Sequence, residues 1–100
     1  MDKIKTLSAA IRYGSTFIGE SKMFIGPNFT GPFTCGCAVG TAYLVVDREC
    51  WSYVYSDKMF ATLSSRFGVP VDVLVEVSSM HFMGKKTRAQ CADWLEQQGY

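Results

Sequence analysis

Apolar side chains recur every three or four positions in several stretches of the chain, which is the spacing of helices that bury one face. In the first stretch these side chains are Ile4, Leu7 and Ile11, and two alanines between them add helix propensity. Gly14 supplies a stop, because glycine readily adopts the left-handed conformation that ends helices. We therefore predict a short amphipathic helix over residues 2–14.

A second stretch of this kind begins at Ser56 and ends at Gly68. Four large apolar side chains share one of its faces: Met59, Phe60, Leu63 and Phe67. The spacing predicts a helix over residues 56–68 that packs through this face. The segment before it, residues 47–55, mixes aromatic and polar side chains and is compatible with either a turn or a brief strand.

The clearest helix signal lies near the carboxyl end, where Thr87 and Gln90 stand three residues apart. This is the spacing of a capping box, in which the two side chains satisfy backbone N–H groups that the first helical turn leaves without partners. Three apolar residues follow at helical spacing: Cys91, Trp94 and Leu95. We predict a helix over residues 87–98 that docks onto the rest of the domain through these side chains.

Small and apolar residues dominate the stretch from Thr34 to Val46. We predict a helix here with Thr34 as its N-cap. Another helix backbone could approach closely at a face of small residues, Cys37, Gly40, Thr41 and Ala42. Because this helix is apolar nearly all round, we place it at the centre of the fold.

Residues 69–78 fit two structures. Valine occupies positions 69, 71, 73, 75 and 77, which is the alternation of a strand. A helix is also open, because Pro70 suits a first helical turn and Asp72 and Glu76 suit its positive end. Val71, Leu74 and Val75 would then form a helical stripe. The scarcity of partner strands favours the helix.

Glycine, phenylalanine and proline fill residues 15–33, so this segment is predicted to be a long loop, with a short β-hairpin over residues 17–25 left open. The predicted fold class is therefore mainly α, a compact bundle of about five short helices with one long Gly/Phe/Pro-rich loop. A chain of 100 residues, 48% of them apolar and 19% charged, fits one globular domain over residues 1–100.

The formal net charge of +1 is too small to attract nucleic acid or an anionic membrane from a distance. No apolar stretch approaches the about 20 residues of a membrane span, and no signal peptide is recognisable at the start. We expect a cytoplasmic protein that has no membrane partner and for which nucleic acid is not the default partner. Its four cysteines are then expected to be free thiols.

Cysteine and histidine offer the only candidate chemistry. Cys35 and Cys37 could form half of a zinc site or a reactive thiol, with His81 as the base. Zinc sites pair their cysteines in both halves, whereas Cys50, Cys91 and His81 stand alone. The sequence also lacks a phosphate-binding glycine loop. We predict no metal, no cofactor and no catalytic residue, and buried structural roles for Cys37 and Cys91.

Aromatic residues are more numerous than a small core needs, and they concentrate in two places. The first is the long loop, which holds Phe17, Phe24, Phe29 and Phe33, and the second is a predicted turn formed by His81, Phe82 and Met83, with Lys85 and Lys86 behind it. These rings either pad the core or form a protein-binding face, because exposed aromatic and Met clusters mark interaction sites. We predict that the residues of both clusters bind a partner.

Three segments carry a resemblance to known proteins: Ala10-Ile11-Arg12-Tyr13-Gly14, residues 37–43 (CAVGTAY) and residues 87–96 (TRAQCADWLE). In this order they resemble segments of small uncharacterised proteins of bacteria and their phages. The chain differs from that pattern in having Cys91 in place of isoleucine and a loop rich in phenylalanine. The resemblance implies a phage or prophage setting and brings no catalytic residues with it.

The leading hypothesis is a non-enzymatic phage or bacterial accessory protein that binds a protein partner, such as a host or defence factor. The alternative is a small DNA-associated regulator that uses Lys85, Lys86 and Arg88. A thiol enzyme with Cys35 or Cys37 and His81 ranks third. Homo-oligomer formation remains open.

Overall fold

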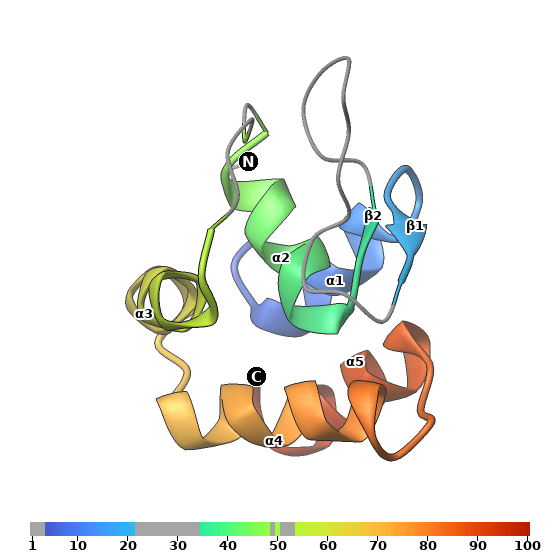
Figure 1. The fold of residues 1–100 in the computed structure, drawn as a ribbon. Coiled ribbons are helices and arrows are strands. Elements are labelled where there is room, and N and C mark those ends of the chain that lie inside the picture. The colour runs from blue at the N-terminus through green and yellow to red at the C-terminus, as the bar shows by residue number, and fades with distance from the viewer. Residues whose placement is uncertain (1–3, 22–34, 49, 51–53) are drawn as a thin grey trace.

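The computed structural model describes residues 4–21, 35–48, 50 and 54–100. In this part of the chain it contains five helices and two short strands, which confirms the predicted mainly helical bundle (Figure 1). The elements are α1 (Leu7–Gly14), β1 (Gly19–Glu20), β2 (Cys35–Gly36), α2 (Ala38–Val46), α3 (Ser56–Phe67), α4 (Val71–Phe82) and α5 (Arg88–Gln97).

Helix α2 lies at the centre, as predicted. Every residue from Ala38 to Val45 is buried, and α1, α3, α4 and α5 all contact this helix. The helix begins later than predicted, because Cys37 rather than Thr34 is its N-cap and accepts a hydrogen bond on Sγ from the Gly40 N–H at 3.5 Å. Thr34 itself lies outside the described residues.

Helix α1 starts at Leu7, after the N-cap Thr6, and not at residue 2 as the spacing suggested. Thr6 Oγ1 accepts a hydrogen bond from the Ala9 N–H, which satisfies one donor of the first turn. Helix α3 has the predicted extent, and its C-cap Gly68 adopts the left-handed conformation with φ of 68°. The Ser8 N–H donates to the carbonyl of Tyr100, so α1 is also tied to the end of the chain.

Residues 71–82 form a helix, as favoured over the strand, but its buried face differs from the predicted one. Leu74, Val77 and His81 are buried, whereas Val71 and Val75 are exposed. The alternating valines leave apolar side chains on both sides of this helix, so spacing alone does not distinguish its inner face from its outer face. Helix α4 forms the lower edge of the molecule in the view of Figure 1.

Helix α5 has the predicted capping box: Thr87 accepts from the Gln90 N–H at 3.1 Å, and Gln90 accepts from the Thr87 N–H at 2.9 Å. Cys91 and Leu95 are buried as predicted, while Trp94 is half-buried against the core. On its exposed side, Asp93 and Glu96 accept hydrogen bonds from Arg12 of α1 at 2.6 and 2.9 Å. Each of these exposed ion pairs adds little stability.

Strand β1 pairs with β2 in parallel, with Gly19 opposite Cys35 and Glu20 opposite Gly36. Strand β1 lies within the suggested hairpin over residues 17–25, but the partner that the structure shows for it is β2, beyond the loop. Residues 22–34 lie outside the described part, as do residues 49 and 51–53 of the segment that was compatible with a turn or brief strand. The described residues of that segment contain no strand.

Helices α1 and α2 approach each other closely at Gly14. A Cβ atom at this position would lie 2.6 Å from Thr41 Cγ2 and 2.8 Å from Val45 Cγ2. We expect Gly14→Ala to lower the free energy of unfolding by about 1–3 kcal/mol, because α1 must shift away from α2. Urea unfolding followed by circular dichroism measures this change.

The matched control is Ser65→Ala on the exposed side of α3, which we expect to change stability by less than about 0.5 kcal/mol. If Gly14→Ala is as stable as the control, then the close approach of α1 and α2 is not a constraint on this fold.

Candidate functional site

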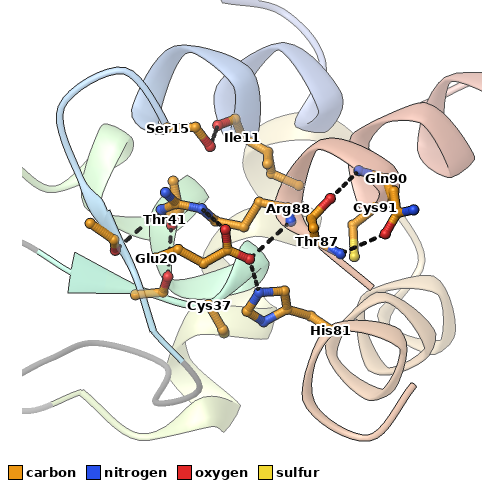
Figure 2. Close-up of polar contacts among 12 residues, drawn as sticks. Ile11, Ser15, Glu20, Cys37, Thr41, His81, Thr87, Arg88, Gln90 and Cys91 are labelled. Atoms are coloured by element: carbon orange, nitrogen blue, oxygen red, sulfur yellow. Dashed lines mark hydrogen bonds and ion pairs between the residues drawn. The ribbon is translucent and has the colours of Figure 1, made fainter. Parts of the chain in front are cut away.

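In the described part of the chain, a cluster of polar side chains, buried except at Glu20, lies where β1, β2, α2, α4 and α5 meet (Figure 2). We call Glu20, Thr41, His81 and Arg88 the polar node. The guanidinium of Arg88 donates through one nitrogen to Thr41 Oγ1 at 2.7 Å and to the Gly19 carbonyl at 3.3 Å. The Thr41 hydroxyl in turn donates to the Gly36 carbonyl at 3.2 Å. One buried cation thus joins α5 to α2 and to the strands.

Glu20 balances this cation. Its carboxylate lies 2.7 Å from His81 Nε2, accepts from the Arg88 backbone N–H at 3.3 Å, and lies 3.9 Å from Arg88 Nε. The Arg88 N–H belongs to the first turn of α5, where the helix dipole favours a negative charge. Glu20 therefore offsets both the Arg88 side chain and the positive end of α5.

Two opposing effects act on the pKa of Glu20. Burial raises this pKa, whereas the hydrogen bonds from His81 and Arg88 and their charges lower it, and the net result is a pKa below the ordinary value of 4.5. Glu20 is therefore an ionised carboxylate at neutral pH. Because a carboxylate can only accept, Nε2 of His81 carries the proton of their shared hydrogen bond.

The carboxylate is also in contact with solvent. Its side chain is 44% exposed, and an open pocket of about 470 Å³ on this side of the molecule is lined by residues that include Ser15, Glu20 and Thr87. The His81 side chain has no exposure at all. The node is therefore open to solvent at Glu20 and closed to it at His81.

Cys37 and Cys91 are both buried, as predicted for them. Burial raises the pKa of the Cys37 thiol above its ordinary value, although the Gly40 N–H and Arg88 act in the opposite direction. A catalytic cysteine needs the reverse, a lowered pKa that yields thiolate at neutral pH. The burial of Cys37 therefore disfavours its use as a nucleophile.

The predicted partner-binding residues separate into an inner and an outer group. His81 is fully buried in the polar node, so its ring does not face outward. Phe82 and Met83 are 60% and 76% exposed, and Lys85 and Lys86 are exposed beside them. The predicted turn over His81, Phe82 and Met83 is wrong, because His81 and Phe82 belong to α4 and Met83 is its C-cap. The end of this helix presents Phe82 and Met83 to solvent and keeps His81 inside.

Phe17 follows α1 and is 40% exposed, with the guanidinium of Arg48 4.2 Å from its ring centroid. Tyr13 packs edge-on against the same ring. The Phe17 ring therefore already contacts two side chains of its own chain, Arg48 and Tyr13. The other three phenylalanines of the predicted interface, Phe24, Phe29 and Phe33, lie outside the described residues.

The basic cluster suggested for DNA contact is divided in the same way. Lys85 and Lys86 are exposed, but the Arg88 side chain is only 7% exposed and its guanidinium contacts Thr41 and Gly19. Arg88 cannot reach a phosphate without leaving the node, so two of the three proposed cations remain at the surface.

Exposed apolar side chains that spacing did not predict lie along the outer side of α4, beside the exposed Asp72, Glu76 and Ser79. Val71 and Val75 are 45% and 47% exposed and continue towards Phe82 and Met83 at the end of the helix. We call these four residues the α4 surface. Single exposed apolar residues are ordinary on proteins, but a row of them along one helix is typical of an interaction site.

Neither the place of Glu20 in this site nor the structural role of Arg88 was predicted from the sequence. One signal was available, because Arg88 occupies the first position of α5, where a cation meets the positive end of the helix dipole. Such a placement is unfavourable unless an anion lies nearby. The sequence does not reveal which anion, since Glu20 is 68 residues away.

Among the described residues, no group of three or more His, Cys, Asp or Glu side chains is arranged to hold a metal ion. The helices described here are all too short or too polar to cross a membrane. Comparison with known proteins found no matching family model, no matching curated protein and no matching solved structure.

The lowered pKa of Glu20 makes a prediction about acid stability. A carboxylate whose pKa is lower in the folded state contributes stability that is complete above its unfolded value and is lost as the pH falls through the folded value. We expect Glu20→Gln to cost about 1 kcal/mol at pH 7, a figure reduced for solvent screening because the side chain is partly exposed. This difference should shrink below the ordinary value of 4.5.

Urea unfolding of both proteins between pH 3 and pH 7 measures the difference, with the exposed Glu76→Gln as the matched control. A difference that stays constant over this range would show that the charge of Glu20 does not stabilise the fold.

A double-mutant cycle tests the contact between Arg88 and Thr41. We expect Thr41→Val and Arg88→Met each to destabilise the protein by about 1–3 kcal/mol, because each leaves a buried hydrogen-bonding group without its partner. The double variant should be more stable than the sum of the two losses predicts, by about 1 kcal/mol or more. Strict additivity of the two losses would contradict a direct contact.

Proposed function

We propose that this chain is a small non-enzymatic accessory protein that acts by binding a protein partner through the α4 surface and the turn after it. The observation that carries the proposal is the row of half-exposed to exposed apolar side chains at Val71, Val75, Phe82 and Met83. Aromatic residues and methionine are enriched at protein interfaces, and removing exposed apolar area from water favours association.

The inner chemistry of the protein supports a non-enzymatic role. The carboxylate, imidazole and guanidinium of the polar node hydrogen-bond or pair with one another and with the backbone. Burial raises the pKa of the Cys37 thiol, which disfavours the nucleophilic thiolate at neutral pH. These groups are used to hold β1, α4 and α5 together.

The resemblance to small bacterial and phage proteins supplies the setting of the proposal. In that setting the partner is a host or defence factor, and the protein works in the cytoplasm of a bacterial cell. Lys85 and Lys86 stand exposed beside the apolar row, so they would contact acidic side chains at the rim of the interface.

Affinity capture from a bacterial host lysate tests this proposal. The tagged chain, its Phe82→Ser variant and the control Ala61→Ser on the exposed side of α3 are incubated with the same lysate. We expect at least one host protein to be retained by the unmodified chain and by the control. Quantitative mass spectrometry should show its recovery falling at least about tenfold with Phe82→Ser, as for the loss of an aromatic anchor.

Circular dichroism first verifies that the variants are folded, which we expect because Phe82 is exposed. If no host protein depends on Phe82, the α4 surface is not a binding site for a host factor and the proposal fails.

A further inference from the structure

An open groove of about 430 Å³ is lined by the last turn of α4, by the turn that follows it and by the outer side of α5. Met80 and Trp94 form its apolar part, and both are half-buried and pack against the core. A volume of this size admits one aromatic side chain and the backbone beside it. Because tryptophan and methionine are enriched at protein interfaces, this apolar part is suited to an apolar side chain of a partner.

This groove is separate from the α4 surface. Val71, Val75 and Phe82 lie along one flank of α4. At about 100° per residue, Met80 is about 140–180° away from each of them around the helix axis. The groove and the α4 surface therefore lie on different flanks of the helix, and what binds to one does not cover the other.

A tight turn after α4 brings a lysine to one end of the groove. The Lys86 N–H donates to the Met80 carbonyl at 3.1 Å, so the Lys86 backbone is held against the last turn of α4. Gly84 has no room for a side chain, since a Cβ atom there would lie 2.8 Å from the same carbonyl oxygen. The backbone thus fixes this turn, and the Lys86 side chain lines the groove.

Lys85, the middle residue of this turn, has a φ of 58°. This left-handed conformation is unfavourable for a residue with a Cβ atom, and glycine or asparagine is more usual there. Residues held in such conformations concentrate at binding sites. Lys85 and Lys86 are both exposed, and in the part of the chain that the structure describes neither takes part in an ion pair. Two positive charges without a carboxylate partner therefore stand together at this end of the groove.

The other polar groups give the groove a direction. Asp93 lines it, but Arg12 lies 2.6 Å away and offsets part of its charge. Glu76 is exposed one turn before Met80 on the same side of α4, away from the lysines. Gln90 Oε1 accepts a hydrogen bond in the capping box of α5, so the NH₂ group of this amide remains as a donor for a carbonyl oxygen. Carboxylates of a ligand are therefore favoured only at the lysine end.

From this arrangement we infer that the groove binds an acidic peptide segment of a protein partner. An aromatic side chain of the segment packs on Trp94 and Met80, and neighbouring carboxylates pair with Lys85 and Lys86. A nucleic-acid strand fits less well, because it carries a phosphate at every nucleotide and would bring negative charge to Glu76 as well. The inference goes beyond the proposed function, since this groove is a second surface with an occupant of its own.

Selection of a random-peptide phage library on the purified full chain tests the inference. We expect the enriched peptides to contain an aromatic residue next to Asp or Glu. Fluorescence anisotropy of a labelled, selected peptide should give a Kd of about 10 µM to 1 mM, as for a small contact area. Lys86→Glu should raise this Kd at least about tenfold. Lys58→Glu, the same charge reversal on the exposed side of α3, should leave it unchanged.

Lys85→Gly separates binding from folding. Glycine adopts a positive φ without strain, so we expect the melting temperature of this variant to equal or exceed that of the unmodified chain. Peptide binding should nevertheless weaken about threefold or more, because one positive charge is lost. A lysine with a merely structural role would leave peptide binding unchanged. Circular dichroism verifies the folding of every variant.

A selection without aromatic and acidic peptides overturns the inference, as does a selected peptide whose binding Lys86→Glu leaves intact. Tighter binding of single-stranded oligothymidylate than of any selected peptide also overturns it, and would assign the groove to nucleic acid. Because these measurements use the purified chain and defined peptides, their failure is distinguishable from a failure of Phe82-dependent capture from the lysate.

Discussion

Arg88 brings a positive charge to the inside of this protein, at the start of a helix whose dipole also repels it. The fold accommodates this charge because Glu20 lies beside it and Thr41 and the Gly19 carbonyl accept from its guanidinium. Because Arg88 is buried, removing its partners would leave its charge without compensation, which costs more than an exposed ion pair contributes. The positions of α5, α2 and β1 therefore depend on one another through a single side chain.

The polar node determines which side of α4 faces solvent. His81 points inward to meet Glu20, so the residues that follow it in α4 and the turn, Phe82 and Met83, are directed to solvent. The same rotation of α4 that buries Leu74 and Val77 exposes Val71 and Val75. The polar node contacts one side of α4, and the exposed apolar side chains lie on another side. The buried contacts of α4 therefore fix the direction in which these apolar side chains point.

Local signals were sufficient to predict most of the helical framework. The capping box at Thr87, the stop at Gly68 and the apolar character of residues 38–46 each specify structure through neighbours in the sequence. The inner face of α4 could not be predicted in this way, because its valines make both sides apolar and packing against α2 and α5 decides between them. The pairing of Arg88 with Glu20 is likewise a product of the tertiary fold.

The central claim is that the outer side of α4 is the surface through which this protein makes contacts. Amide chemical shifts of the ¹⁵N-labelled chain, recorded as a host protein captured from the lysate is added, test it directly and locate the contact residue by residue. We predict shifts that grow with the added protein at Val71, Val75, Phe82 and Met83, with α1 unaffected. Shifts confined to α1 or α3, or the absence of any shift when the host protein is in excess, would contradict it.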